Sequence, residues 1–174
     1  METILFVFSG LPASGKSTLA KHITKIYGAV YLRIDTIEQG LLDLCHFEVQ
    51  GEGYELSYRI ANDNLKLGNN VVSDSCNPIN LTRNRWEKLA SLNGSRCINI
   101  EVICSDKAEH QKRLKERVNE VENLKVLSWE DIVRREYHPW IGDRIIIETA
   151  HKSITSCVDE LVNKIELLLK NELK

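Results

Sequence analysis

Residues 10–17, with the sequence Gly-Leu-Pro-Ala-Ser-Gly-Lys-Ser, have types and spacing that point directly to chemistry. They match the pattern G-x-x-x-x-G-K-[ST], in which a turn wraps backbone N–H groups around phosphate oxygens and the next helix adds its positive end. In this pattern Lys16 reaches the β- and γ-phosphates, and the hydroxyl of Ser17 binds Mg²⁺. The sequence therefore predicts a nucleotide-binding phosphate loop. Its expected contacts are Gly10, Ala13, Ser14, Gly15, Lys16, Ser17 and Thr18.

Pro12 decides against a second interpretation of the same glycines. Gly10 and Gly15 have the spacing of the outer glycines of a dinucleotide-binding turn, and Asp35 lies about where its ribose-binding acid would be. That turn needs a glycine at position 12 so that the backbone can approach a pyrophosphate. Proline blocks the approach and lacks an N–H, and a dinucleotide site leaves Lys16 unexplained. We therefore reject an NAD site.

Two aspartates close predicted strands and offer carboxylates beside the loop. Asp35, after residues 30–34, is placed to accept a proton from an acceptor hydroxyl or to orient it. Asp35 can equally cap the next helix, and the two roles can coexist. Asp74, which ends residues 70–74, can hold Mg²⁺ through water, or it can be a cap or turn residue.

Arginines flank a polar stretch late in the chain. Arg113 and Arg117 are four residues apart on one predicted helix face, and Arg134 and Arg135 follow beyond the stretch. Two such cationic clusters describe a lid, at about residues 117–136, that neutralises a transferring phosphate. The alternative is ordinary solvated helix charge.

The elements that must position these residues alternate regularly. Apolar runs at residues 4–8, 30–34, 70–74, 97–104 and 144–149 predict five strands, and segments with helical periodicity lie between and after them. This alternation predicts an α/β domain with a parallel sheet covered by helices on both faces. Ligands bind at the carboxyl ends of such strands, where the loop, Asp35 and Asp74 all fall. Asn99 and Glu101 are unusual in a strand buried on both faces.

Composition narrows the class of protein. The 174 residues fit a single domain, residues 1–174, and a net charge of −2 without charged blocks argues against a nucleic-acid polymer or an acidic membrane as partner. The five cysteines form no C-x-x-C pair, which favours thiols in a reducing compartment. The N-terminal apolar run is too short for a signal peptide or a membrane span. We expect a cytoplasmic protein, either a monomer or a homodimer.

Other phosphate-loop classes lack their distinguishing residues here. A regulatory GTPase needs N-K-x-D, but Asn163-Lys164 is followed by Ile165-Glu166. A mechanical ATPase usually ends a strand in Asp-Glu, whereas Ser75 follows Asp74. A small-molecule kinase needs neither motif. A regulatory nucleotide-binding protein with slow ATPase activity stays open as an alternative. A kinase of polynucleotide 5′-ends also stays open, although the near-neutral charge counts against it.

The segments "SGLPASGKSTLA", "YLRID", "VVSDSCNP", "VICSDKAEHQKRLKERV" and "WEDIVRREYHPW" together resemble a family of small P-loop predicted kinases, which often carry the label AAA domain. Zeta toxins, chloramphenicol phosphotransferase, gluconate kinase and polynucleotide kinase are more distant relatives. The resemblance spans nearly the whole chain and implies strand order 2-3-1-4-5, ATP and Mg²⁺ as cofactors, and a kinase acting on a small molecule. It implies that Asp35 faces the acceptor hydroxyl and that Arg117 and Arg135 are the lid arginines. It does not name the acceptor.

Overall fold

A five-stranded parallel sheet forms the centre of the computed structural model, which describes residues 2–171. The strands lie in the order β2-β3-β1-β4-β5. Their bounds are β1 Ile4–Ser9, β2 Val30–Arg33, β3 Val71–Asp74, β4 Arg96–Ile103 and β5 Ile145–Glu148. The five predicted strands, the parallel sheet and the strand order are therefore confirmed.

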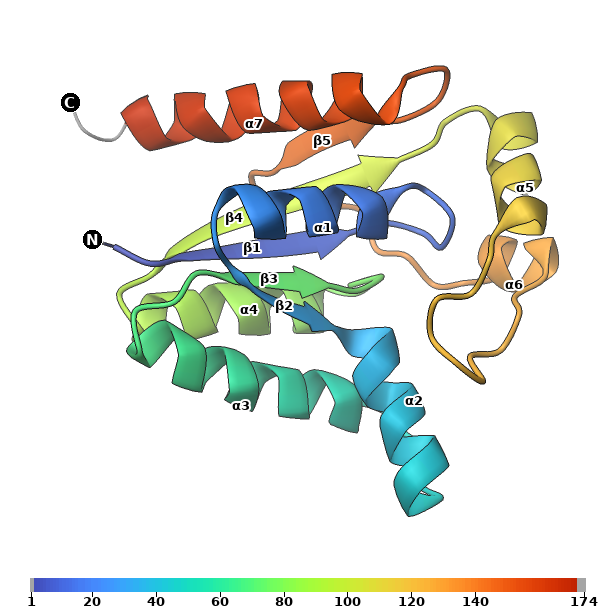
Figure 1. Ribbon diagram of the computed structural model, residues 1–174, viewed down its shortest axis with the longest axis horizontal. Helices are drawn as coiled ribbons and strands as arrows, with labels where there is room; N and C mark the ends of the chain where they lie inside the picture. The colour runs from blue at the N-terminus through green and yellow to red at the C-terminus, as the bar shows by residue number, and fades with distance from the viewer. Residues whose placement is uncertain (1, 172–174) are drawn as a thin grey trace.

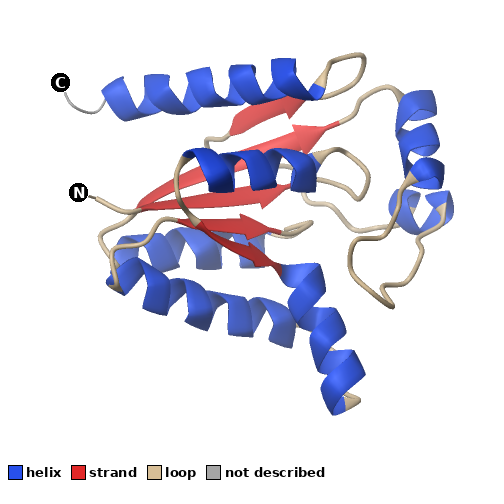
Figure 2. Ribbon diagram, viewed as in Figure 1, coloured by secondary structure: helices blue, strands red, loops and turns tan. Residues whose placement is uncertain are grey.

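Helices cover both faces of the sheet and make three layers (Figures 1 and 2). Helices α1 (Lys16–Ile26) and α7 (Ile154–Asn171) pack on one face, and α3 (Glu52–Lys66) and α4 (Asn80–Leu92) pack on the other. In β1, Phe6 and Phe8 join the core under α1 and α7, while Leu5 and Val7 join the core over α3 and α4. The run is continuously apolar because alternate side chains enter two different cores.

The second strand is shorter than the sequence predicts. It ends at Arg33, and α2 (Ile34–Cys45) begins at the next residue. Asp35 therefore lies in the first turn of α2 and neither closes the strand nor serves as the N-cap, a position that Arg33 takes. Both expectations were wrong, because the chain passes from strand to helix without a loop residue between them.

The predicted lid, at about residues 117–136, contains one short helix. Helix α5 spans Lys107–Glu116 and precedes the predicted lid, and α6 spans Trp129–Val133 within it. Residues beyond α6 instead run back along the sheet, where the hydroxyl of Tyr137 and Nε of Arg144 donate to the Glu101 carboxylate of β4. Asn99 donates to Glu87 of α4. These partners explain the polar residues of β4.

The carboxyl ends of all five strands point to one end of the molecule. There they meet the glycine-rich loop, the start of α2, and the lid with α5 and α6, while both ends of the described chain lie opposite (Figure 1). None of the helices formed by residues 2–171 has the length and apolar character needed to cross a membrane.

Candidate active site

The loop between β1 and α1 needs both of its glycines. Gly10 has φ +141°, and a Cβ there would lie 2.3 Å from the carbonyl oxygen of Val102. Gly15 has φ +95°, in the left-handed region that favours glycine. Ala13 also has a positive φ, +65°, so the loop turns through the left-handed region twice. This conformation gives the loop its tight curl ahead of the N-terminus of α1.

Pro12 lies at the tip of the loop and contacts α5. Its carbonyl oxygen is 2.8 Å from Nε2 of His110 in α5. A carbonyl oxygen can only accept, so His110 holds a proton on Nε2. The His110 ring packs edge-on against Trp129 of α6, with ring centroids 5.3 Å apart. These contacts connect the loop tip to α5 and, through the His110 ring, to α6.

Lys16 makes a buried ion pair at the start of α1. Its Nζ lies 2.6 Å from Oδ1 of Asp74, which is 1% exposed, and the hydroxyl of Tyr31 donates to Oδ2 at 2.6 Å. Burial by itself raises the pKa of Asp74, but the Lys16 charge and hydrogen bonds from Lys16, Tyr31 and Ser17 outweigh it and hold that pKa below its ordinary value. Asp74 is therefore an ionised carboxylate beneath the loop.

The oxygen donors beside Lys16 fit a magnesium ion. The Ser17 hydroxyl is within reach of the Asp74 carboxylate, and Mg²⁺ is typically bound by one or two such protein oxygens together with substrate phosphates and water. Within residues 2–171 no three His, Cys, Asp or Glu side chains cluster as a self-sufficient metal site. Any Mg²⁺ here would depend on a nucleotide for most of its ligands.

A cavity of about 560 Å³ opens at this end of the sheet and brings most of the predicted site together. Its wall includes the glycine-rich loop with Lys16 and Ser17, Asp35 from α2, and Arg117 and Arg135 from the lid. Ser14 and Asp74 are not part of the wall. Asp74 lies behind Lys16 and reaches the cavity through its contact with that side chain.

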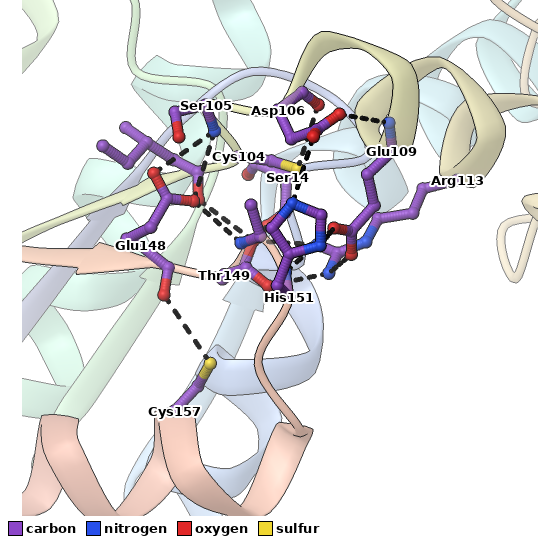
Figure 3. A network of polar contacts seen from close by, with 12 residues as sticks. Ser14, Cys104, Ser105, Asp106, Glu109, Arg113, Glu148, Thr149, His151 and Cys157 are labelled. Atoms are coloured by element: carbon purple, nitrogen blue, oxygen red, sulfur yellow. Dashed lines mark hydrogen bonds and ion pairs between the residues drawn. The ribbon is translucent and has the colours of Figure 1, made fainter.

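Arg113 supports the phosphate loop and has no freedom to act as a mobile lid cation. Its guanidinium donates to Oγ1 and to the carbonyl oxygen of Thr149, each at 2.8 Å, and pairs with Glu109 (Figure 3). The Thr149 hydroxyl in turn contacts the carbonyl oxygen of Ser14 at 2.8 Å. Figure 3 shows that the His151 ring contacts the carboxylates of Asp106 and Glu109 and so joins the same network. The arginines therefore differ in role. The predicted helix face shared by Arg113 and Arg117 is wrong, because α5 ends at Glu116 and Arg117 is its C-cap residue with an extended backbone.

The lid is attached to the sheet by a residue that the sequence analysis missed. Glu120 Oε2 accepts from Nη1 of Arg33 at 2.8 Å and from Nζ of Lys21 at 2.5 Å. By contrast, Arg117 and Arg135 form no ion pair with any carboxylate of residues 2–171. Residues 117–136 thus contain the Glu120 contact to β2 and α1 and three cations of the cavity wall that make no salt bridge within residues 2–171, namely Arg117, Lys125 and Arg135.

Glu38 is a second missed residue, three positions after Asp35 on α2. Burial and the nearby Asp35 carboxylate raise the pKa of Glu38 to about 7, and Arg135 opposes the rise. The spacing i, i+3 from Asp35 is the signal in the sequence that could have identified it. The cavity wall therefore carries two carboxyl groups side by side.

This combination of a Walker-type loop, a five-stranded sheet of order 2-3-1-4-5 and a short lid defines a P-loop kinase-like fold. Residues 5–135 match the family described as an AAA domain (AAA_33), so the chain belongs to that family of small P-loop proteins. No curated protein matches the chain in sequence.

Solved structures with this fold include several kinases. A putative kinase from Chloroflexus aurantiacus has a TM-score of 0.70 and 18% identity, with 94% of this chain and 96% of that chain covered. A gluconokinase from Sinorhizobium meliloti has a TM-score of 0.69 and 13% identity, with coverage of 99% and 95%. An APS kinase from Mycobacterium tuberculosis, in complex with AMPPNP and APS, has a TM-score of 0.64 and 15% identity, with coverage of 95% and 98%. At these identities the likeness shows the fold.

Proposed function

We propose that this protein is an ATP- and Mg²⁺-dependent kinase that transfers the γ-phosphoryl group to a hydroxyl or phosphate of a small molecule. The observation that carries the proposal is the shared cavity, whose wall includes the phosphate loop, Asp35 from the first turn of α2, and Arg117 and Arg135. A kinase fold among the solved structures, including one with bound AMPPNP, supports it.

Each group has a defined task in this proposal. Lys16 and the backbone N–H groups of the loop bind the β- and γ-phosphates. Ser17 and Asp74 would hold Mg²⁺, which would supply positive charge to neutralise the phosphates. Asp35 orients an acceptor hydroxyl and takes its proton as the new bond between oxygen and phosphorus forms. The bond between the γ-phosphorus and the bridging oxygen breaks, and ADP leaves with that oxygen. Arg117 and Arg135 stabilise the equatorial oxygens during transfer and exclude water.

Two variants test this assignment. Lys16→Ala should bind ATP poorly and transfer nothing. Asp35→Asn should keep ATP affinity within about threefold and lose transfer by about 10²–10⁴-fold, the range of general-base contributions. Nucleotide affinity is measured by titration calorimetry and transfer by ADP release with and without acceptor.

The outcomes separate the alternatives. ADP release that never responds to any acceptor would favour a slow regulatory ATPase over a kinase. Wild-type transfer by Asp35→Asn would remove Asp35 from the mechanism. Loss of ATP binding in that variant would assign Asp35 to the metal site, with Asp74 the next candidate for the base.

A further inference from the structure

We infer that Glu38 is a positioning residue for the acceptor and that Asp35 and Glu38 together select a non-aromatic, polyhydroxylated molecule. This inference rests on the proposed kinase function and specifies its substrate class. It is carried by the packing of Glu38, by the donors and acceptors at this end of the cavity, and by the absence of aromatic rings from the described part of its wall.

Helix α2 presents both carboxyl groups to the same space. Asp35 and Glu38 are three residues apart, so their side chains lie on one face of the helix, and both line the cavity. Asp35 faces the phosphate loop in the proposed mechanism. Glu38, one turn further along, contacts the part of an acceptor that lies next to its reacting hydroxyl.

Helix α3 holds the Glu38 side chain in position. A Cβ on Gly53 would lie 2.2 Å from Cγ of Glu38 and 2.8 Å from its Oε1. Gly53 is buried in the first turn of α3, so Glu38 occupies the space that any other residue would fill. This packing limits the rotamers of Glu38 and directs its carboxyl group before an acceptor arrives.

The charges around Glu38 allow it to keep a proton near neutral pH. Burial contributes most to raising the pKa of Glu38 to about 7, Asp35 of α2 and Glu52 of α3 add to the rise, and Arg135 beyond α6 opposes it. Near that pH Glu38 is partly protonated, so its carboxyl group can donate a hydrogen bond as well as accept one. Hydroxyl groups are suited to both.

Arg33 adds a hydrogen-bond donor to the same cavity. Its side chain is 8% exposed, its Nη1 is bound to Glu120 and its buried Nε has no partner within residues 2–171. The guanidinium group as a whole lines the cavity, and its N–H groups can only donate, so it favours an oxygen acceptor in a ligand. A hydroxyl group that donates to a carboxylate and accepts from an arginine fits this mixture of donors and acceptors.

Aromatic side chains near the cavity are engaged elsewhere. Trp129 packs against His110, and Tyr137 and Trp140 stack on the guanidinium of Arg83, which is itself buried among backbone carbonyl groups. Among the described residues of the cavity wall there is no Phe, Tyr or Trp. A nucleobase would therefore find no ring on which to stack at this end of the site.

The test compares acceptors and variants. Wild type, Glu38→Gln and Glu38→Ala are assayed for ATP-dependent phosphorylation of glycerol, ribitol, sorbitol and myo-inositol, and of the nucleosides adenosine and cytidine. Glu48→Gln, an exposed glutamate of the loop before α3, is the matched control. We expect transfer to at least one polyol and to neither nucleoside. Glu38→Ala should raise the polyol KM about tenfold, the loss of roughly one hydrogen bond, with a smaller change in kcat, and Glu38→Gln, whose amide can still donate, should raise it less.

Two further readouts exclude a merely structural role. The dependence of polyol KM on pH should show a step near pH 7 in wild type that Glu38→Gln lacks, and Glu38→Ala should be worse than Glu38→Gln. ATP affinity, measured by titration calorimetry, should stay within about twofold in both variants. Unchanged KM and pH profile in Glu38→Gln would overturn the role of Glu38.

The results distinguish a failure of the substrate class from a failure of the kinase proposal. Transfer to nucleosides, or to none of the polyols by a wild-type protein that binds ATP, would overturn the substrate class and leave the phosphate loop intact. A wild-type protein that neither binds ATP nor releases ADP would overturn both.

Discussion

Replacing Gly53 with alanine tests the contact on which the orientation of Glu38 depends. The new Cβ would meet Cγ of Glu38 at 2.2 Å, which forces that side chain or the first turn of α3 to move. Overpacking of this kind lowers the free energy of unfolding by about 1–3 kcal/mol, and the higher helix propensity of alanine relative to glycine raises it by about 1 kcal/mol. The expected net loss of unfolding free energy is therefore about 0–2 kcal/mol. In a Glu38→Ala background the clash is gone, so the same substitution should stabilise the protein by about 0.5–1 kcal/mol.

The measurement is a double-mutant cycle from urea unfolding, with an expected coupling of about 1–3 kcal/mol between positions 38 and 53. Gly40→Ala is the matched control, because a Cβ on that α2 glycine meets no atom within 4 Å. It should stabilise the protein equally whether residue 38 is glutamate or alanine. A coupling below about 0.3 kcal/mol would mean that Glu38 does not occupy the space above Gly53, and the reasoning about its fixed orientation would be wrong.

Two further predictions concern the charges of the site. Arg117→Ala and Arg135→Ala should each slow phosphoryl transfer by up to about 10³-fold while weakening ATP binding much less. Transfer is measured by turnover and ATP binding by calorimetry. Wild-type turnover in both variants would show that the two arginines are solvated surface charges with no role in transfer. Tyr31→Phe removes a hydrogen bond to Asp74 and should cost about 1–2 kcal/mol at neutral pH. Because the pKa of Asp74 is depressed in the folded protein, its stabilisation is present above the ordinary carboxyl pKa and is lost as pH falls. Tyr31→Phe should begin to lose the stabilisation by ionised Asp74 at a higher pH than wild type does in acid unfolding. Acid-unfolding transitions at the same pH in both proteins would contradict a role of Tyr31 in lowering the pKa of Asp74.

Local patterns were sufficient to predict the framework of the fold. Strands buried on both faces are continuous apolar runs, and the phosphate loop has its glycines and lysine at fixed offsets within eight residues. Both signals are contained in a short window of sequence, so the five strands and the loop conformation agree with the prediction. The strand order came from the family resemblance, because hydrophobic periodicity does not report which strands are neighbours.

Side-chain partners in the site could not be predicted in the same way. Lys16 and Asp74 are 58 residues apart in the chain, and Arg33 and Glu120 are 87 apart. No local pattern selects such partners, since the folded backbone brings them together. The prediction of where β2 ends failed for a different reason. Ile34 continues the strand-like run in the sequence, but it is the first residue of α2 in the structure.

The cations near the cavity fall into two groups, and this division explains why the lid arginines should affect rate more than affinity. Lys16 already has a carboxylate partner, Asp74, so a triphosphate gains from it only after it has displaced or shared that partner. Arg33, which is paired with Glu120, lies at the acceptor end of the cavity in the proposed site. Arg117 and Arg135 make no salt bridge within residues 2–171, although the charge of Arg135 acts on Glu38, and they belong to the predicted lid. A cation without a salt-bridge partner interacts most favourably with a phosphate where negative charge is concentrated and water is excluded. Both conditions hold during phosphoryl transfer beneath a closed lid. In the proposed kinase Lys16 therefore holds the ground-state nucleotide, and Arg117 and Arg135 stabilise the charge of the phosphoryl group during transfer.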